Sequence, residues 1–263
     1  MKTVYLEGIG LLAPGLRGWW ESVSILKGTS AYRYQDMPAF RSSLLPANER
    51  RRTTRVINLV LQVAQEAVAQ AGVEAKQLYS VFASSEGDSE VIDKICTALT
   101  RAERLVSPTL FHNSVHNAPA GYWSIATGCT LPSTSLSAYD DSFSAGLLEA
   151  ATLVLIEQAW VLLVAYDYPT PFPLSEKRGL YTPFATALLL NSRKTAQTWA
   201  RLQLQALSHG VEDRLDQEHL ERLRTGNPAA RSLPLLRAIA AGAACDVVLP
   251  YSATHKLSVG LKP

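Results

Sequence analysis

The spacing of hydrophobic positions predicts a strand and a long helix near the start of the chain. Residues 3–12 (TVYLEGIGLL) are rich in β-forming residues and end just before Pro14-Gly15, as expected for a strand that leads into a turn. Residues 49–71 carry apolar side chains at helical spacing and are followed by Gly72, a common helix stop.

The same patterns continue along the chain. Helical spacing predicts helices over residues 89–101 and 142–158. Short apolar runs predict strands over residues 79–83, 134–138, 160–166, 185–190 and 200–207. The run 160–166 is apolar throughout, which is typical of a strand buried on both faces. The last two strands are separated only by the polar residues 191–197 and are candidates for a hairpin.

Alternation of strands and helices favours an α/β fold with a largely parallel sheet that is covered by helices on both sides. Beyond residue 208 the pattern changes to a charged helix over 211–225 and a helix of small residues over 234–244. We therefore predict one domain over residues 1–263, with a core over about 1–207 and a helical C-terminal tail over 208–263.

Composition narrows the class of protein. Apolar residues make up 47% of the chain and charged residues 18%, which is typical of a globular protein. A net charge of +2 argues against nucleic-acid binding. No signal peptide is recognisable, and the longest apolar run is too short for a membrane span, so we expect a soluble, cytoplasmic protein. Cys96, Cys129 and Cys245 have unrelated spacings and indicate neither a disulfide framework nor a zinc site.

The segment 107–150 is the most informative for function. Pro119 suits the first turn of a helix, and a strand then leads through Tyr139-Asp140-Asp141 into a helix that begins near Ser142. Such a turn directs backbone N–H groups and the positive end of a helix at whatever lies there. Enzymes place nucleophiles at turns of this kind.

At these residues the sequence resembles the ketosynthases of fatty-acid and polyketide synthesis, which belong to the thiolase superfamily. The matching positions, in order, are Phe111, Asn117, Ala120, Gly121, Pro132 and Ser133. Tyr139-Asp140 stands where the family has Ala-Cys, and the opening VYLEGIGLLAPG resembles the family's first strand and turn. The resemblance covers about residues 1–207. It implies the N-terminal half of a thiolase-like fold, with a mixed, mostly parallel five-stranded sheet covered by helices.

Two departures from the family bear on activity. Asp140 replaces the nucleophilic cysteine, so no catalytic residue is expected. The family's catalytic histidines lie in a C-terminal half that these 263 residues do not show, and His209, His219 and His255 lack their sequence context.

The resemblance therefore implies a chain-length factor, of the short type found in aryl polyene pathways. Such a protein is not an enzyme and needs no cofactor or metal. It pairs with a full-length ketosynthase and shapes the tunnel for the growing chain. Only the complex would be an acyltransferase, and an acyl carrier protein would be an indirect partner. The residues that the resemblance places at the interface or tunnel are Phe111, His112, Asn113, Ser114, Val115, His116, Asn117, Thr134 and Leu136.

Several of these residues have other interpretations. Asp140 and Asp141 are either a catalytic carboxylate pair or, as we prefer, a cap on the helix that follows; a salt bridge across an interface is a third option. His112 and His116 have the i, i+4 spacing of a metal site. Without a third ligand nearby, we interpret them as hydrogen-bonding groups at an interface or tunnel wall.

The remaining candidates have ordinary structural explanations. The basic run Arg50-Arg51-Arg52, with Arg55, either contacts an acidic carrier protein or is a solvated helix start. Cys129 is predicted to be a small apolar filler rather than a nucleophile. The SFSAG context of Ser142 does not match a hydrolase elbow.

Two other functions stay open. One is a small acyl-thioester hydrolase or decarboxylase that uses Asp140. The other is a homodimer that binds acyl chains.

Overall fold

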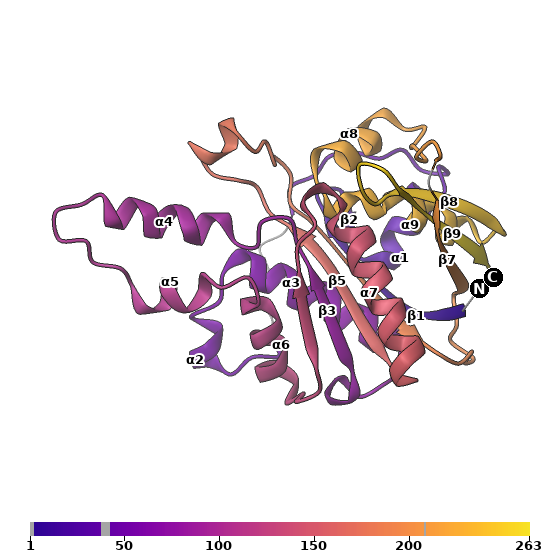
Figure 1. Cartoon of the computed structure of the whole chain (residues 1–263), viewed down its shortest axis with the longest axis horizontal. Coiled ribbons are helices and arrows are strands. Elements are labelled where there is room, and N and C mark those ends of the chain that lie inside the picture. Colours follow the sequence, from indigo (N-terminus) through magenta and orange to yellow (C-terminus); the bar gives the residue numbers. More distant parts are fainter. Residues whose placement is uncertain (1–2, 38–42, 208) are drawn as a thin grey trace.

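A computed structural model describes residues 3–37, 43–207 and 209–263. In this part of the chain a nine-stranded sheet has helices on both faces (Figure 1). The strands are β1 (Thr3–Ala13), β2 (Leu16–Arg17), β3 (Tyr79–Ala83), β4 (Ser133–Leu136), β5 (Val161–Asp167), β6 (Phe184–Asn191), β7 (Ala200–Leu207), β8 (Cys245–Pro250) and β9 (Lys256–Lys262). The α-helices are α1 (Trp19–Leu26), α2 (Ala47–Arg50), α3 (Arg55–Ala71), α4 (Ser89–Leu99), α5 (Pro108–Asn113), α6 (Ala118–Thr127), α7 (Ser142–Glu157), α8 (Glu218–Gly226) and α9 (Leu233–Ala241).

The α/β class is confirmed, but the expectation of a mostly parallel, five-stranded sheet is wrong. The strand order is β4-β3-β5-β6-β1-β7-β9-β8, with β2 beside β1. The pairings of β3 with β4 and with β5 are parallel, and the other pairings among the described strands are antiparallel. Parallel neighbours need a long crossover, usually a helix. No α-helix lies between β5 and β6, so these strands pair antiparallel.

The hairpin of β6 and β7 is also wrong, because β1 lies between these two strands. Tyr5 of β1 pairs with Asn191 of β6 on one side and with Arg201 of β7 on the other. The polar residues 192–199 therefore cross the end of β1 rather than form a tight turn. Local hydrophobic patterns do not encode the insertion of a strand that is almost 200 residues away.

Helix α3 covers one face of the sheet and begins six residues later than expected. The Thr54 side chain accepts a hydrogen bond from the N–H of Ile57 and so caps the helix, while the arginines before it lie in α2 and the following turn. The helix backbone packs directly on β1. A Cβ atom at Gly8 or Gly10 would lie 2.0 Å from a carbonyl oxygen of α3, which explains glycine at these two positions.

The C-terminal segment is not only helical. Its helices α8 and α9 lie within or near the predicted ranges, but β8 and β9 extend the sheet beyond β7. The segments CDVVLP and KLSVGLK alternate buried and exposed positions along much of their length, as strands on an amphipathic sheet do.

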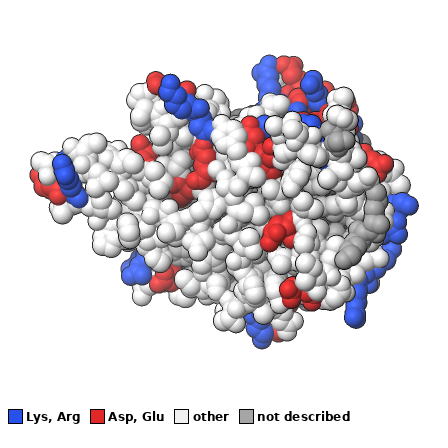
Figure 2. Space-filling model, viewed as in Figure 1, with Lys and Arg blue, Asp and Glu red and all other residues white. Residues whose placement is uncertain are grey.

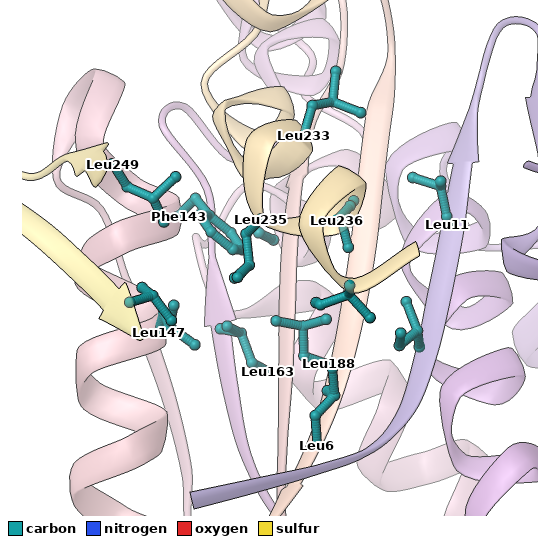
Figure 3. Packing of buried hydrophobic residues seen from close by; sticks show 14 of the residues in the cluster. Leu6, Leu11, Phe143, Leu147, Leu163, Leu188, Leu233, Leu235, Leu236 and Leu249 are labelled. Carbon is teal, nitrogen blue, oxygen red and sulfur yellow. The ribbon is translucent and has the colours of Figure 1, made fainter. Parts of the chain in front are cut away.

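The C-terminal segment also contributes to the apolar core on the face of the sheet that α7 covers. Leu233, Leu235 and Leu236 of α9 are fully buried in one cluster with Phe143 and Leu147 of α7, and Leu235 points toward Phe143 (Figure 3). Leu6 of β1, Leu163 of β5 and Leu188 of β6 belong to the same cluster on the sheet. Helix α7 is thus packed between the sheet and the C-terminal segment.

No helix in the described ranges is long and apolar enough to cross a membrane.

Candidate functional site

The connection between β4 and α7 places Asp140 in a tight strand-to-helix turn. Tyr139 to Asp141 form a short 3-10 helix, η2, and Tyr139 has a φ of +53°, in the left-handed region. The Ser142 hydroxyl accepts a hydrogen bond from the N–H of Ala138 at 3.0 Å and donates to the carbonyl of Tyr139 at 2.7 Å. The turn predicted from the sequence is therefore present, and Ser142 holds it closed.

Two arginines bind the Asp140 carboxylate, one on each oxygen. Nη1 of Arg178 lies 2.6 Å from Oδ1, and Nη2 of Arg231 lies 2.8 Å from Oδ2. The side chain of Asp140 is 34% exposed and that of Arg178 only 18%, so water screens the pairs incompletely. The two guanidinium groups occupy both carboxylate oxygens, which a nucleophile or base would need.

Arg178 also connects three segments around the turn. Its Nε is 3.0 Å from a carboxylate oxygen of Glu86, and its Nη2 donates to the Ser85 hydroxyl at 2.6 Å. Its guanidinium carbon lies 3.8 Å from the centre of the Tyr139 ring. One side chain therefore ties together the loop after β3, the η2 turn and the segment between β5 and β6.

The preferred interpretation of Asp140 and Asp141 as helix caps is wrong. Asp141 occupies the N-cap position of α7, but its side chain makes no capping hydrogen bond. It lies instead 3.6 Å from Arg231. Burial raises the pKa of the Asp141 carboxyl, and Arg231 opposes that shift. The salt bridges of Asp140 are made within this chain.

A second carboxylate, Asp167, is buried behind this network. Its Oδ1 accepts hydrogen bonds from the Ser84 hydroxyl at 2.9 Å and the Ser85 N–H at 2.8 Å, while its Oδ2 has no partner in the described structure. Burial raises the pKa of Asp167 from 3.8 to about 7, and the bonds from Ser84 and Ser85 oppose this shift. Asp167 fixes the loop after β3 to the end of β5.

Sequence reasoning did not find Arg178, Arg231, Glu86 or Asp167. Arg231 is 91 residues from Asp140 and no local pattern joins them. Asp167 did carry a signal, since it is a charged residue directly after a wholly apolar strand that is buried along its length.

The residues predicted for an interface or tunnel fall into two groups. Phe111 and Val115 are 71% and 53% exposed. Asn113 is buried and donates to the carbonyl of Arg52 at 2.8 Å, while Ser114 donates to the carbonyl of Phe111 at 2.8 Å. Asn113 and Ser114 therefore make local structural bonds, whereas Phe111 and Val115 present apolar surface.

The other predicted residues lie at α6 and β4. Asn117 is the exposed N-cap residue of α6, and Thr134 and Leu136 are half-buried in β4. An open groove of about 540 Å³ runs between these elements. Its walls include His116, Asn117, Ser124, Leu131, Ser133 and Ser135.

The edge of β4 and the segment leading to it expose apolar surface. Strand β4 ends the sheet, so among the described strands only β3 pairs with it. Helices α4 and α5 extend from the body beside it as an arm (Figure 1). Apolar side chains more than a third exposed recur from α4 to η2: Ile92, Leu99, Leu105, Phe111, Val115, Ile125, Leu131 and Tyr139. We call these eight residues the β4-side surface.

The two histidines do not share a site. The His112 ring contacts Tyr122 edge-on at 6.1 Å, whereas Nε2 of His116 lies 3.2 Å from the carbonyl oxygen of Ser84. Within the described ranges no three His, Cys, Asp or Glu side chains are arranged to hold a metal ion. Cys129 is buried with its Sγ 3.3 Å from the carbonyl oxygen of Leu78, in agreement with its prediction as a filler.

The basic run has structural partners in part. Arg50 donates to the carbonyl of Leu45 at 3.0 Å, and Arg52 lies 3.5 Å from Glu49. Arg51 and Arg55 are exposed.

Solved structures with the same fold include three ketosynthase complexes. A ketosynthase in complex with its chain length factor from Xenorhabdus doucetiae contains a chain that is 24% identical, with a TM-score of 0.74 and coverage of 99% of this chain and 100% of that one. The ishigamide ketosynthase/chain length factor matches at 13% identity and a TM-score of 0.75, over 99% of both chains. A type II polyketide synthase acyl-carrier protein in complex with its ketosynthase matches at 12% identity and a TM-score of 0.76, again over 99% of both chains.

These likenesses show a shared fold. A search of curated protein sequences finds no match. The family model for the N-terminal domain of beta-ketoacyl synthase matches residues 26–246, which is most of the chain. The resemblance deduced from the order of short motifs is thereby confirmed, and the chain belongs to the beta-ketoacyl synthase family, as a form of its N-terminal domain.

Proposed function

We propose that this chain is a non-catalytic chain-length factor that forms a heterodimer with a full-length ketosynthase. The observation that carries the proposal is Asp140, which stands at the nucleophile position of the family and is bound by Arg178 and Arg231. A cysteine there would accept an acyl group from a thioester. A carboxylate held by two guanidinium groups does not take over that role.

The salt-bridge network would preserve the shape of the nucleophile turn without its chemistry. Arg178 connects the turn to Glu86 and to Tyr139, and Arg231 connects it to the segment before α9. In this proposal the turn is kept because it positions β4 and the start of α7 for a partner.

The β4-side surface would be the contact with the ketosynthase. An unpaired strand edge beside exposed apolar side chains is a surface that water disfavours and a partner would cover. Two of its members, Phe111 and Val115, are themselves predicted interface residues, and Leu131 lies three residues before Thr134. The groove between α6 and β4 would then be closed by the partner, so that His116 and Asn117 line part of the tunnel for the growing chain.

The C-terminal segment would replace part of the cover that a full-length ketosynthase obtains from its second half. Leucines of α9 already share one buried cluster with apolar side chains of α7. This arrangement supports a subunit whose own core is closed and whose remaining apolar surface faces a partner. An acyl carrier protein would deliver substrate to the ketosynthase rather than to this chain. The three solved structures with the same fold are of ketosynthases with a chain length factor or with an acyl-carrier protein.

The test is co-expression with a full-length ketosynthase from the same biosynthetic locus, followed by size-exclusion chromatography with mass determination. We expect a one-to-one complex and chain elongation that requires this subunit. Elongation is expected to persist with Asp140→Ala, because no bond to substrate is made there. A monodisperse protein that elutes without the ketosynthase would refute the heterodimer. Thioesterase or decarboxylase activity that disappears with Asp140→Asn would assign an enzymatic role instead, and a homodimer that retains acyl chains would assign a binding role.

A further inference from the structure

A row of three polar side chains, two of them cationic, crosses three strands far from β4. Tyr5 of β1 pairs with Arg201 of β7, and Arg201 pairs with Lys262 of β9. Paired residues on neighbouring strands project from the same face of a sheet at the strand spacing of about 4.8 Å. The neighbouring residues Val4, Leu202 and Leu261 are buried in the core, so the row lies on the opposite face.

The positive charges of Arg201 and Lys262 lie side by side and are not paired with an acidic side chain in the described structure. Arg201 and Lys262 are directly opposed like charges, an arrangement that destabilises a sheet. In the described structure neither forms a salt bridge, and Nε of Arg201 is buried without a hydrogen-bond partner. Buried N–H groups of arginine are normally satisfied, because leaving one unpaired costs about 1–3 kcal/mol.

The loop before β7 turns this row into a small pocket of about 220 Å³. The pocket is lined by Tyr5, Lys194, Thr198, Arg201, Lys262 and Pro263. Side chains of Lys and Arg gather in Figure 2 at the edge where the two termini lie in Figure 1.

Two acidic side chains lie near the pocket, but in the described structure neither forms a salt bridge with Lys194, Arg201 or Lys262. Glu7 is buried and accepts hydrogen bonds from Thr195 and Thr198, so the Thr198 hydroxyl is committed to it. Asp246 lies opposite Gly260, one row away from Lys262 on the same face. Three cationic side chains, Lys194, Arg201 and Lys262, thus face one enclosed volume.

We propose that this pocket binds a small oxyanion, a phosphate or carboxylate group. The planar guanidinium of Arg201 would bind two oxygens and satisfy its buried Nε–H, and the ammonium groups of Lys194 and Lys262 would complete the charge balance. The hydroxyl of Tyr5 supplies a neutral donor. The bound anion would also separate the opposed charges of Arg201 and Lys262. The site requires no ketosynthase, so its test is independent of the proposed function.

The experiment is calorimetric titration of the isolated full chain with inorganic phosphate at constant ionic strength. We expect one site, with affinity reduced about tenfold or more in Arg201→Gln and in Lys262→Gln, as expected for loss of a charge-assisted hydrogen bond. Arg101→Gln removes an exposed charge elsewhere and is expected to bind phosphate like the wild type. Lys262 is exposed at the end of its strand, so its variant keeps the test valid if Arg201→Gln fails to fold.

Absence of a binding signal for both phosphate and acetate in the wild type, or equal affinities in the wild type and Lys262→Gln, would overturn the proposal. A parallel titration with acetate assigns the chemistry. Tighter binding of phosphate would indicate a phosphoryl ligand and tighter binding of acetate a carboxylate, and either result upholds the site.

Discussion

Apolar side chains are buried in the C-terminal region of the molecule and exposed along the chain from α4 to η2. In the C-terminal region, leucines of α9 share one cluster with Phe143 of α7, and both Phe143 and Leu236 are fully buried. In the chain that precedes α7, from α4 to η2, the eight apolar residues of the β4-side surface are exposed. The chain therefore covers its own core in the C-terminal region and leaves the apolar side chains of the β4-side surface exposed.

The largest effect on stability is expected in the core that the C-terminal segment closes. Leu236→Ala removes a fully buried side chain from α9, where the surroundings cannot collapse completely. We expect the free energy of unfolding to fall by about 2–5 kcal/mol in chemical denaturation.

Val211→Ala is the matched control, because Val211 is 85% exposed in the same segment and its truncation should change little. A loss of less than about 1 kcal/mol for Leu236→Ala would mean that α9 is not part of the cooperative core. The contrast between a buried C-terminal region and the exposed β4-side surface would then be wrong.

The next effect concerns Asp167, the buried carboxyl behind the η2 turn. Its folded-state pKa of about 7 exceeds the ordinary value of 3.8, so the folded state binds more protons than the unfolded state between these values. The free energy of unfolding should therefore fall as pH rises through this window, with a contribution of up to ~1.4 kcal/mol per pH unit from Asp167. Below the window the contribution is intact, and above pH 7 the loss is complete.

Asp167→Asn removes this titration. The difference in stability between wild type and variant, measured by denaturation from pH 4 to pH 8, should shift in favour of the variant as pH rises and then level off. A difference that does not change with pH would show that Asp167 keeps an ordinary pKa in the folded protein.

A smaller loss is expected at the salt-bridge network. Arg178→Gln leaves Asp140 with Arg231 alone and deprives Glu86 of its ion pair. Partial exposure of these groups limits the cost to about 1–2 kcal/mol of unfolding free energy. A double-mutant cycle with Asp140→Asn measures the coupling, and additive effects would mean that the two side chains do not stabilise the turn together.

Sequence patterns predicted the parts of this molecule that local physics determines. Strands β3 and β5 were located to within one residue, because a strand buried on both faces is a continuous apolar run. The position of Asp140 followed from the order of short motifs around a strand-to-helix turn. These are features that a few neighbouring residues specify together.

Long-range features were missed for the corresponding reason. The place of β1 between β6 and β7 depends on pairing across most of the chain, and local apolar runs are equally compatible with a hairpin. The partners of Asp140 come from the segment after β5 and the segment before α9. Charged residues in such segments resemble ordinary solvated loops until the fold brings them together.

The smallest effect on stability, and the sharpest test of the comparison, is expected on the β4-side surface. Phe111→Ala removes a side chain that is 71% exposed, so the free energy of unfolding of the isolated chain should change by less than about 0.5 kcal/mol. If this surface binds a ketosynthase, the same change should weaken the complex about tenfold or more, as measured by titration of the purified subunits, because a buried aromatic side chain contributes strongly at the centre of an interface. Val211→Ala again serves as the exposed control and should leave the complex unchanged. A Phe111→Ala variant that loses stability but binds normally would place Phe111 in the folding core, and the division between a closed side and an open side would have to be withdrawn.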